Sequence, residues 1–351
     1  MGIQLSSSRK PESIPMLNAR AATPRGTRAN FKFRISASKA CLVVAGVFGA
    51  FVSQDLARAQ APAMPPEKVV EILGQHIHYY EAGQGENIIL LHGLGASAEI
   101  WAANIPALSP RYHVVVPDQL GFGNSDKPPI EYKIQTWVEF LDLFMRALGI
   151  PKAIVVGNSL GGWIAVDFAR QHPEKVARLV LADAAGWRPI NVPAPLAKGL
   201  NNPSEAGVRQ VIELMLFERR AIPINLNPGS LEETRKMLEF LVADKQLITD
   251  QVVEQEFERH LKIGDGYTIQ RFLAGSVAED QFENEKLRHL TLSTLILWGR
   301  EDRLFPLEIG RHYAQAISGS KLVIIEQCGH VPQLEKSAEF NKALLDYLSG
   351  S

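Results

Sequence analysis

A serine stands between small residues at the end of an apolar run, in the segment Gly157-Asn-Ser-Leu-Gly161. The residues before it, Ala153-Ile-Val-Val156, are typical of a buried strand, and the residues after it, Trp163 to Ala169, are typical of a helix. A G-x-S-x-G pattern on a turn from strand to helix exposes a strained serine hydroxyl at the carboxyl edge of a sheet. We therefore predict that Ser159 is a nucleophile rather than an ordinary turn serine.

Such a serine needs a base, because a hydroxyl at its free pKa is a poor nucleophile. The chain offers nine histidines. His76 and His78 alternate along one predicted strand and could pair on a metal ion, but no third ligand accompanies them. We expect them to be exposed histidines of a hairpin, and the sequence predicts no metal site.

The elements that must position these residues alternate between short apolar runs and helical patterns from about residue 68 onward. Continuous apolar runs fit a parallel sheet covered on both faces, so we predict an α/β fold with a doubly wound, mostly parallel sheet. The runs 69–73 and 76–80 flank Gly74-Gln75 and are expected to form a hairpin. Further strands are expected at 87–91, 113–116, 153–156, 179–182, 294–298 and 322–325, and helices at 98–109, 135–149, 160–172, 307–318 and 337–348.

One insertion interrupts this alternation between Ala182 and Thr294, where about 110 residues contain no strong strand pattern. It starts with a proline-rich stretch and continues with amphipathic segments, so we predict a helical cap inserted between two strands. The predicted organisation is a core of residues 62–186 and 291–351 with a cap of residues 187–290.

The first 61 residues differ in charge from the rest of the chain. They carry nine basic and two acidic residues, a net charge of +7. The remainder of the chain carries 28 basic and 36 acidic residues, a net charge of −8. A short apolar run, residues 41–53, follows most of these cations and is too short to span a bilayer, which takes about 20 residues. We predict an export leader cleaved near Ala59 or Ala61, and hence a secreted or periplasmic protein with no stable membrane span. An organelle-targeting peptide and a start at Met16 instead of Met1 stay open.

The acidic remainder has no basic stripe, which gives no electrostatic reason to bind nucleic acid. Only Cys328 remains after leader removal, so no disulfide can form within the mature chain. The sequence gives no indication of oligomeric state.

Four motifs in one order make the chain resemble the α/β-hydrolase fold family over roughly residues 68–349. They are Leu91-His-Gly-Leu-Gly95, Asp118-Gln-Leu-Gly-Phe-Gly-Asn-Ser-Asp126, the serine turn, and Trp298-Gly-Arg-Glu-Asp302 followed by Cys328-Gly-His330. The resemblance implies a triad of serine, acid and histidine. It also implies two backbone N–H groups that stabilise an oxyanion, and no metal or organic cofactor.

Carried onto this sequence, the resemblance implies Ser159 as the nucleophile, His330 as the base and Asp302 as the acid. Leu94 and Leu160 fall where the family has its oxyanion N–H groups. Alternatives for the acid are Asp183, where some relatives carry it, and Glu301, which is expected to be solvated. His92 is expected to order the oxyanion turn.

A small-molecule acyl substrate is expected, and the sequence leaves three functions open. The chain resembles hydrolases that cleave carbon–carbon bonds in ring-fission products, but Glu256 stands where they place an arginine for the substrate carboxylate, and Val331 where they place a tryptophan. A glutamate there would repel a carboxylate. A serine hydrolase of small or medium acyl esters is therefore predicted. Carbon–carbon hydrolysis is the alternative, and a non-catalytic ligand-binding member of the fold is the second alternative.

Overall fold

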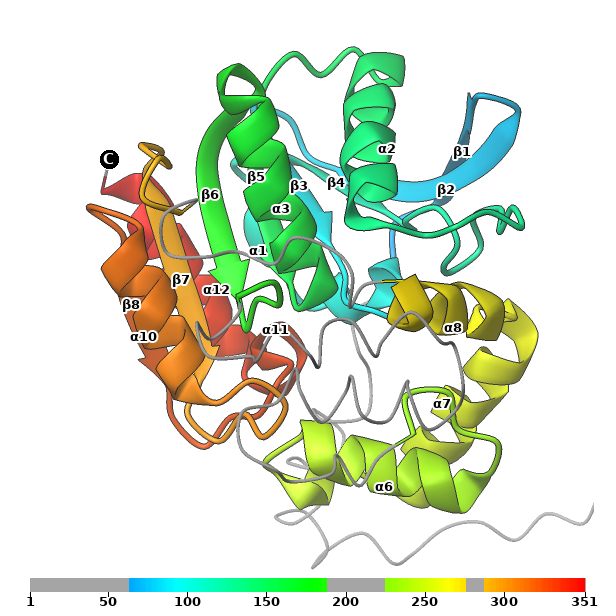
Figure 1. Cartoon of the computed structure of the whole chain (residues 1–351). Helices are drawn as coiled ribbons and strands as arrows, with labels where there is room; N and C mark the ends of the chain where they lie inside the picture. Colours follow the sequence, from blue (N-terminus) through cyan, green and yellow to red (C-terminus); the bar gives the residue numbers. More distant parts are fainter. Residues whose placement is uncertain (1–62, 188–224, 276–286, 351) are drawn as a thin grey trace, which may run out of the picture. The chain divides into compact units, whose positions relative to one another are not determined.

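The computed structural model describes residues 63–187, 225–275 and 287–350 of the 351-residue chain (Figure 1). The predicted leader and parts of the predicted cap, residues 188–224 and 276–286, lie outside the described residues. Within the described ranges, no helix combines the length and the apolar character that crossing a membrane requires.

The core is an eight-stranded sheet with the strand order β1-β2-β4-β3-β5-β6-β7-β8. The first hairpin and the β2–β4 pair are antiparallel, and all other neighbours are parallel. The mostly parallel sheet predicted from the apolar runs is thereby confirmed. The strands are β1 (Glu67–Ile72), β2 (Gln75–Ala82), β3 (Glu86–Leu91), β4 (Tyr112–Pro117), β5 (Ala153–Asn158), β6 (Val176–Ala182), β7 (Thr294–Gly299) and β8 (Lys321–Ile325).

Helices cover both faces of this sheet (Figure 1). Successive side chains of β3 alternate between two hydrophobic clusters: Ile89 joins residues of α2, α3 and α10, whereas Ile88 joins residues of α1 and α12. Burial on both faces explains why the strands are continuously apolar. The core helices are α1 (Ile105–Leu108), α2 (Ile134–Ala147), α3 (Leu160–Gln171), α10 (Leu307–Ala316), α11 (Pro332–Glu335) and α12 (Ser337–Ser349).

The helix predicted over 98–109 is replaced by two short pieces, a 3₁₀ turn at Ala98–Trp101 and α1. Pro106, the second residue of α1, explains the break. A proline has no backbone N–H and its ring excludes the carbonyl four residues earlier, so a helix cannot run through it undisturbed.

Between β6 and β7 the described chain forms three helices, α6 (Leu231–Leu241), α7 (Asp250–Ile263) and α8 (Gly266–Gly275). They lie beyond the end of the sheet toward which the β6 arrow points (Figure 1). Ser230 and Thr249 cap the first two of these helices through their side-chain oxygens. This inserted segment therefore lies over the sheet edge where β5 delivers Ser159.

Candidate active site

The predicted nucleophile stands on a strained turn between β5 and α3. Ser159 has φ 54° and ψ −118°, a conformation that L-residues rarely adopt. A Cβ at Gly157 would lie 2.1 Å from the carbonyl oxygen of Gly161, and a Cβ at Gly161 would lie 2.4 Å from that of Leu91. Only glycines therefore permit the turn that presents the serine hydroxyl.

The predicted base and acid meet at the end of two neighbouring strands. His330 follows β8, and its Nδ1 lies 2.8 Å from Oδ2 of Asp302, which follows β7. The other oxygen of Asp302 accepts hydrogen bonds from the backbone N–H groups of Leu304 (2.8 Å) and Phe305 (2.9 Å). Both carboxylate oxygens are thus engaged, which fixes the side chain that orients the imidazole.

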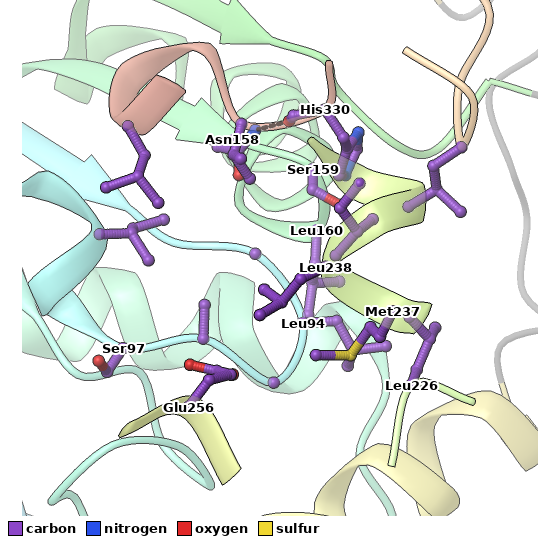
Figure 2. Close-up of a pocket in the computed structure, with 18 of the residues that line it drawn as sticks. Leu94, Ser97, Asn158, Ser159, Leu160, Leu226, Met237, Leu238, Glu256 and His330 are labelled. Carbon is purple, nitrogen blue, oxygen red and sulfur yellow. Dashed lines mark hydrogen bonds between the residues drawn. The ribbon is translucent and has the colours of Figure 1, made fainter. Parts of the chain in front are cut away.

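Serine and histidine line one pocket, as Figure 2 shows. The side chain of Asn158 connects their backbones, because its Nδ2 donates to the carbonyl of His330 (3.2 Å) and to that of Ala182 (3.1 Å). Among the hydrogen bonds of the described residues, none joins the Ser159 hydroxyl to the imidazole. Serine–base hydrogen bonds are often loose until substrate is bound, so the missing bond does not argue against His330 as the base.

The alternative acid Asp183 lies beside the pair without taking the place of Asp302. Ligand-type atoms of Asp183, Asp302 and His330 lie within 4.8 Å of one another. Asp183 is fully buried, and its Oδ1 accepts from the N–H of Gly299 (3.0 Å). Burial and then the negative charge of Asp302 raise the pKa of Asp183 well above its ordinary value. Its buried position therefore favours the protonated form of Asp183.

The other alternative acid, Glu301, is exposed, as expected of a solvated side chain. Although exposed, it accepts a hydrogen bond from the N–H of Cys328 (2.9 Å) through Oε2. This hydrogen bond joins it to the backbone two residues before His330 and not to the imidazole.

The predicted oxyanion turn is held by a neutral histidine. Nδ1 of His92 donates to the carbonyl of Gly93 (2.8 Å), and its Nε2 accepts from the N–H of Gln119 (3.0 Å). Burial lowers the pKa of His92 to about 4, so the ring stays uncharged at neutral pH. A Cβ at Gly93 would lie 3.1 Å from Cβ of Ser159, which shows how closely this turn approaches the serine.

Leu94 and Leu160, the residues predicted to supply oxyanion N–H groups, both line the pocket beside Ser159 (Figure 2). Leu160 is the first residue of α3, where backbone N–H groups have no partner inside the helix. The two positions thus lie where an oxyanion formed at Ser159 could be reached.

The pocket has a volume of about 330 Å³, at the lower end for small-molecule sites. Its walls are mainly apolar and come from the core and from the inserted segment, with Met237, Leu238 and Phe272 among them. Figure 2 shows Ser97 and Glu256 at the end of the pocket away from His330. One end of the site therefore carries the candidate catalytic groups, and the other is polar.

An arginine that the sequence analysis overlooked occupies this polar end. Arg259 lies one turn beyond Glu256 on α7, and its Nε donates to Oε2 of Glu256 (2.9 Å). Its Nη2 donates to the carbonyl of Gly95 in the predicted oxyanion turn (2.7 Å), and its buried Nη1 has no hydrogen-bond partner among the described residues. The helical spacing i, i+3 was the signal that could have revealed it.

The sheet topology and the serine turn together place the chain among the α/β hydrolases. A family model described as alpha/beta hydrolase fold matches residues 86–337, and the chain belongs to this family. The chain is 30% identical over 308 residues to a 2-hydroxymuconate semialdehyde hydrolase from Pseudomonas sp. (strain CF600), which covers 82% of this chain and 96% of the relative.

Two further comparisons agree with the first. The chain is 33% identical over 285 residues to a 2-hydroxy-6-oxo-6-phenylhexa-2,4-dienoate hydrolase from Burkholderia cepacia, covering 78% of this chain and 91% of the relative. A crystal structure of the meta-cleavage product hydrolase from Pseudomonas fluorescens IP01, an S103A mutant complexed with acetates, matches with a TM-score of 0.68 and 28% identity over 81% of this chain and 97% of that one.

These relatives show that the prediction of an ester hydrolase is wrong and favour the carbon–carbon alternative. The prediction rested on comparing single positions, at which Glu256 replaces an arginine. The structure supplies a guanidinium from Arg259 to the same pocket and pairs it with Glu256. Residues three apart lie on the same helix face and the Arg259 guanidinium offsets the charge of Glu256, so the glutamate by itself does not exclude an anionic substrate.

Proposed function

We propose that the chain hydrolyses a carbon–carbon bond in the dienoate product of an aromatic ring fission, through Ser159, His330 and Asp302. The observation that carries this proposal is the likeness, over more than nine tenths of their length, to relatives that act on such compounds. The pocket supports it, because catalytic groups stand at one end and a partly unpaired guanidinium at the other.

The chemistry of a 2-hydroxy-6-oxo-dienoate dictates the order of steps. Its 2-hydroxyl loses a proton and carbon 5 gains one, which leaves a 2-ketone conjugated with the chain. Ser159 then adds to the 6-carbonyl while His330 takes its proton. The backbone N–H groups of Leu94 and Leu160 stabilise the oxyanion.

The bond between carbons 5 and 6 then breaks, and its electron pair passes through the conjugated chain to the oxygen on carbon 2. The dienolate takes up a proton from water on that oxygen and leaves as a 2-hydroxydienoate, and His330 releases the serine proton to solvent. A water molecule, activated by His330, hydrolyses the acyl–serine ester and releases a carboxylic acid. Asp302 keeps the imidazole in the tautomer that both steps require.

Arg259 recognises the carboxylate of the dienoate in this proposal. Its buried Nη1 lacks a partner within the described part of the chain, and a hydrogen bond to a charged group is worth about 1.5–3 kcal/mol, or roughly 10- to 100-fold in affinity. The pair with Glu256 and the bond to Gly95 hold the guanidinium plane in place. The acyl group of the substrate lies among the apolar walls near Ser159.

The test compares 2-hydroxy-6-oxo-6-phenylhexa-2,4-dienoate with its methyl ester, which lacks the carboxylate charge. Wild-type protein should cleave the acid, and Ser159→Ala should lose at least about 10³-fold in kcat. Arg259→Gln should raise KM for the acid by about 10- to 100-fold and leave that for the methyl ester within about threefold.

The matched control is Arg271→Gln, which removes an arginine of α8 that does not line the pocket. Failure of wild-type protein to cleave the dienoate contradicts the proposal. Reaction of Ser159 with a fluorophosphonate separates a catalyst with another substrate from a protein that only binds ligands.

A further inference from the structure

One carboxylate joins the histidine loop to the inserted segment. Oε2 of Glu335 accepts from the N–H of Gly329 (2.7 Å), the residue before His330. Its Oε1 accepts from the N–H of Asp244 (2.7 Å), which follows α6 in the inserted segment. Two backbone donors far apart in the sequence are thereby held by a single side chain.

The same two pieces of chain also touch directly. The N–H of His330 donates to the carbonyl of Leu241, the last residue of α6, over 2.7 Å. A Cβ at Gly329 would lie 2.2 Å from that carbonyl oxygen and 3.0 Å from the backbone nitrogen of Ala243. Residues 241–244 therefore pack against the backbone of the histidine loop with no room for a side chain between them.

Glu335 is itself fixed close to the loop that it holds. It ends α11, a four-residue helix that begins two residues after His330, and its N–H donates to the carbonyl of Val331 (2.8 Å). Its carboxylate is partly buried, and both oxygens are engaged by N–H donors, which is the arrangement in which hydrogen bonds to a charged group are strongest.

We propose that Glu335 is a positioning residue that fixes His330 by clamping the histidine loop to residues 241–244. Asp302 orients the imidazole ring from one side, and the clamp holds the backbone that carries the ring. The inserted segment thus completes the geometry of the base in addition to lining the pocket. This inference rests on the proposed role of His330 and reaches beyond it to a residue that touches neither substrate nor imidazole.

Proton transfer tolerates little displacement of the base, so loss of the clamp should slow catalysis. A misplacement of about 1 Å can cost about 100-fold in rate. Glu335→Ala loses both bonds and is expected to lower kcat by about 100-fold with KM within about threefold. Glu335→Gln keeps one acceptor for two donors and is expected to lower kcat by about tenfold.

The backbone end of the clamp can be tested without changing Glu335. Asp244 has φ −78°, which suits proline, and Asp244→Pro removes the N–H that Glu335 accepts. We expect a loss of kcat of about tenfold, whereas Asp244→Ala keeps the N–H and should stay within about twofold. Adding Asp244→Pro to Glu335→Ala should cause no further loss, because both changes break one clamp.

The matched control is Glu301→Gln, since Glu301 also accepts from the histidine loop, at Cys328, but has no hydrogen bond to residues 241–244. It should stay within about threefold of wild type in kcat. Equal losses for Glu301→Gln and Glu335→Gln, or additive losses for Glu335→Ala and Asp244→Pro, overturn the clamp. Thermal unfolding shows whether Glu335→Ala is misfolded. If it is, the kcat values of Glu335→Gln and Asp244→Pro test the clamp in its place.

The rate of fluorophosphonate labelling of Ser159 is measured on the same variants. It depends on the base and requires no particular substrate. Labelling that falls in the predicted order, with no cleavage of the dienoate by wild type, contradicts the proposed function and upholds the clamp. Labelling that is unchanged in Glu335→Ala contradicts the clamp, whatever the dienoate assay shows.

Discussion

Asp302→Asn gives a sharp test of the acid, because the structure dictates how the new amide must lie. Oδ1 of Asp302 accepts from two backbone N–H groups, those of Leu304 and Phe305. The amide oxygen must take that position, so the NH₂ group faces Nδ1 of His330, 2.8 Å away in the native pair. Nδ1 then has to accept a hydrogen bond, and the ring proton moves to Nε2. That nitrogen should be unprotonated to take the proton of Ser159.

A wrong tautomer of this kind lowers kcat by about 10⁴ in a serine–histidine–aspartate triad. We expect a loss of 10³- to 10⁴-fold here, about 4–5.5 kcal/mol of transition-state stabilisation. The assay is single-turnover cleavage of the dienoate, with fluorophosphonate labelling beside it. Folding should be unaffected, since the variant keeps the shape and the two backbone hydrogen bonds.

The paired variant is Asp183→Asn. The raised pKa of Asp183 favours its neutral form, which asparagine mimics, and asparagine keeps the acceptor for the N–H of Gly299. We expect kcat within about tenfold of wild type, because no charge beside His330 is lost. The assignment of Asp302 is refuted if Asp302→Asn retains a tenth of the activity, or if Asp183→Asn loses as much.

Stability should respond to pH through two buried groups, with opposite signs. The pKa of His92 is about 6.5 in the unfolded chain and about 4 in the folded chain, so the unfolded chain binds the proton more tightly. The free energy of unfolding, measured by urea titration, should therefore fall by about 3 kcal/mol between pH 6.5 and pH 4. The His92→Gln variant should show a smaller fall over the same range. The pKa of Asp183 is raised by burial and by the neighbouring Asp302, so its contribution to folding stability is full below pH 3.8 and is lost as the pH rises. Because asparagine carries no charge at any pH, Asp183→Asn should raise Tm more at about pH 8 than at about pH 4. Gly157→Ala, whose Cβ would lie 2.1 Å from the Gly161 carbonyl, should cost about 1–3 kcal/mol in thermal unfolding, while Gly229→Ala, with no contact closer than 3.8 Å, should be near neutral.

The sheet could be predicted because each of its strands carries a local pattern. The run before Ser159 is apolar at every position, and the structure buries every residue of β5. The hairpin was predicted with its turn at Gly74-Gln75, whereas Leu73 and Gly74 form it, with φ 51° and 77°. A leucine with positive φ is not a turn signal, which explains the shift by one residue.

The candidate site was partly readable for the same reason. Ser159, Asp302 and His330 each follow a strand, and parallel strands deliver their carboxyl ends to one edge. Arg259 and Glu335 were missed because their roles depend on which face of a helix meets the pocket or the histidine loop. That information lies in the packing between the inserted segment and the core and in no local pattern.

Burial favours the neutral form of two polar groups beside the proposed triad. His92 has a lowered pKa and Asp183 a raised one, both chiefly through burial. A charged imidazolium at His92 would stabilise a negative charge before any substrate had bound, and a second carboxylate at Asp183 would compete with Asp302 for the His330 proton. The carboxylate of Asp302 is the acidic group that His330 meets at hydrogen-bond distance, so in the proposed mechanism it stabilises the protonation of His330 during serine attack. The pocket thus separates its charges, with Arg259 and Glu256 at the recognition end and the acid–histidine pair at the reacting end.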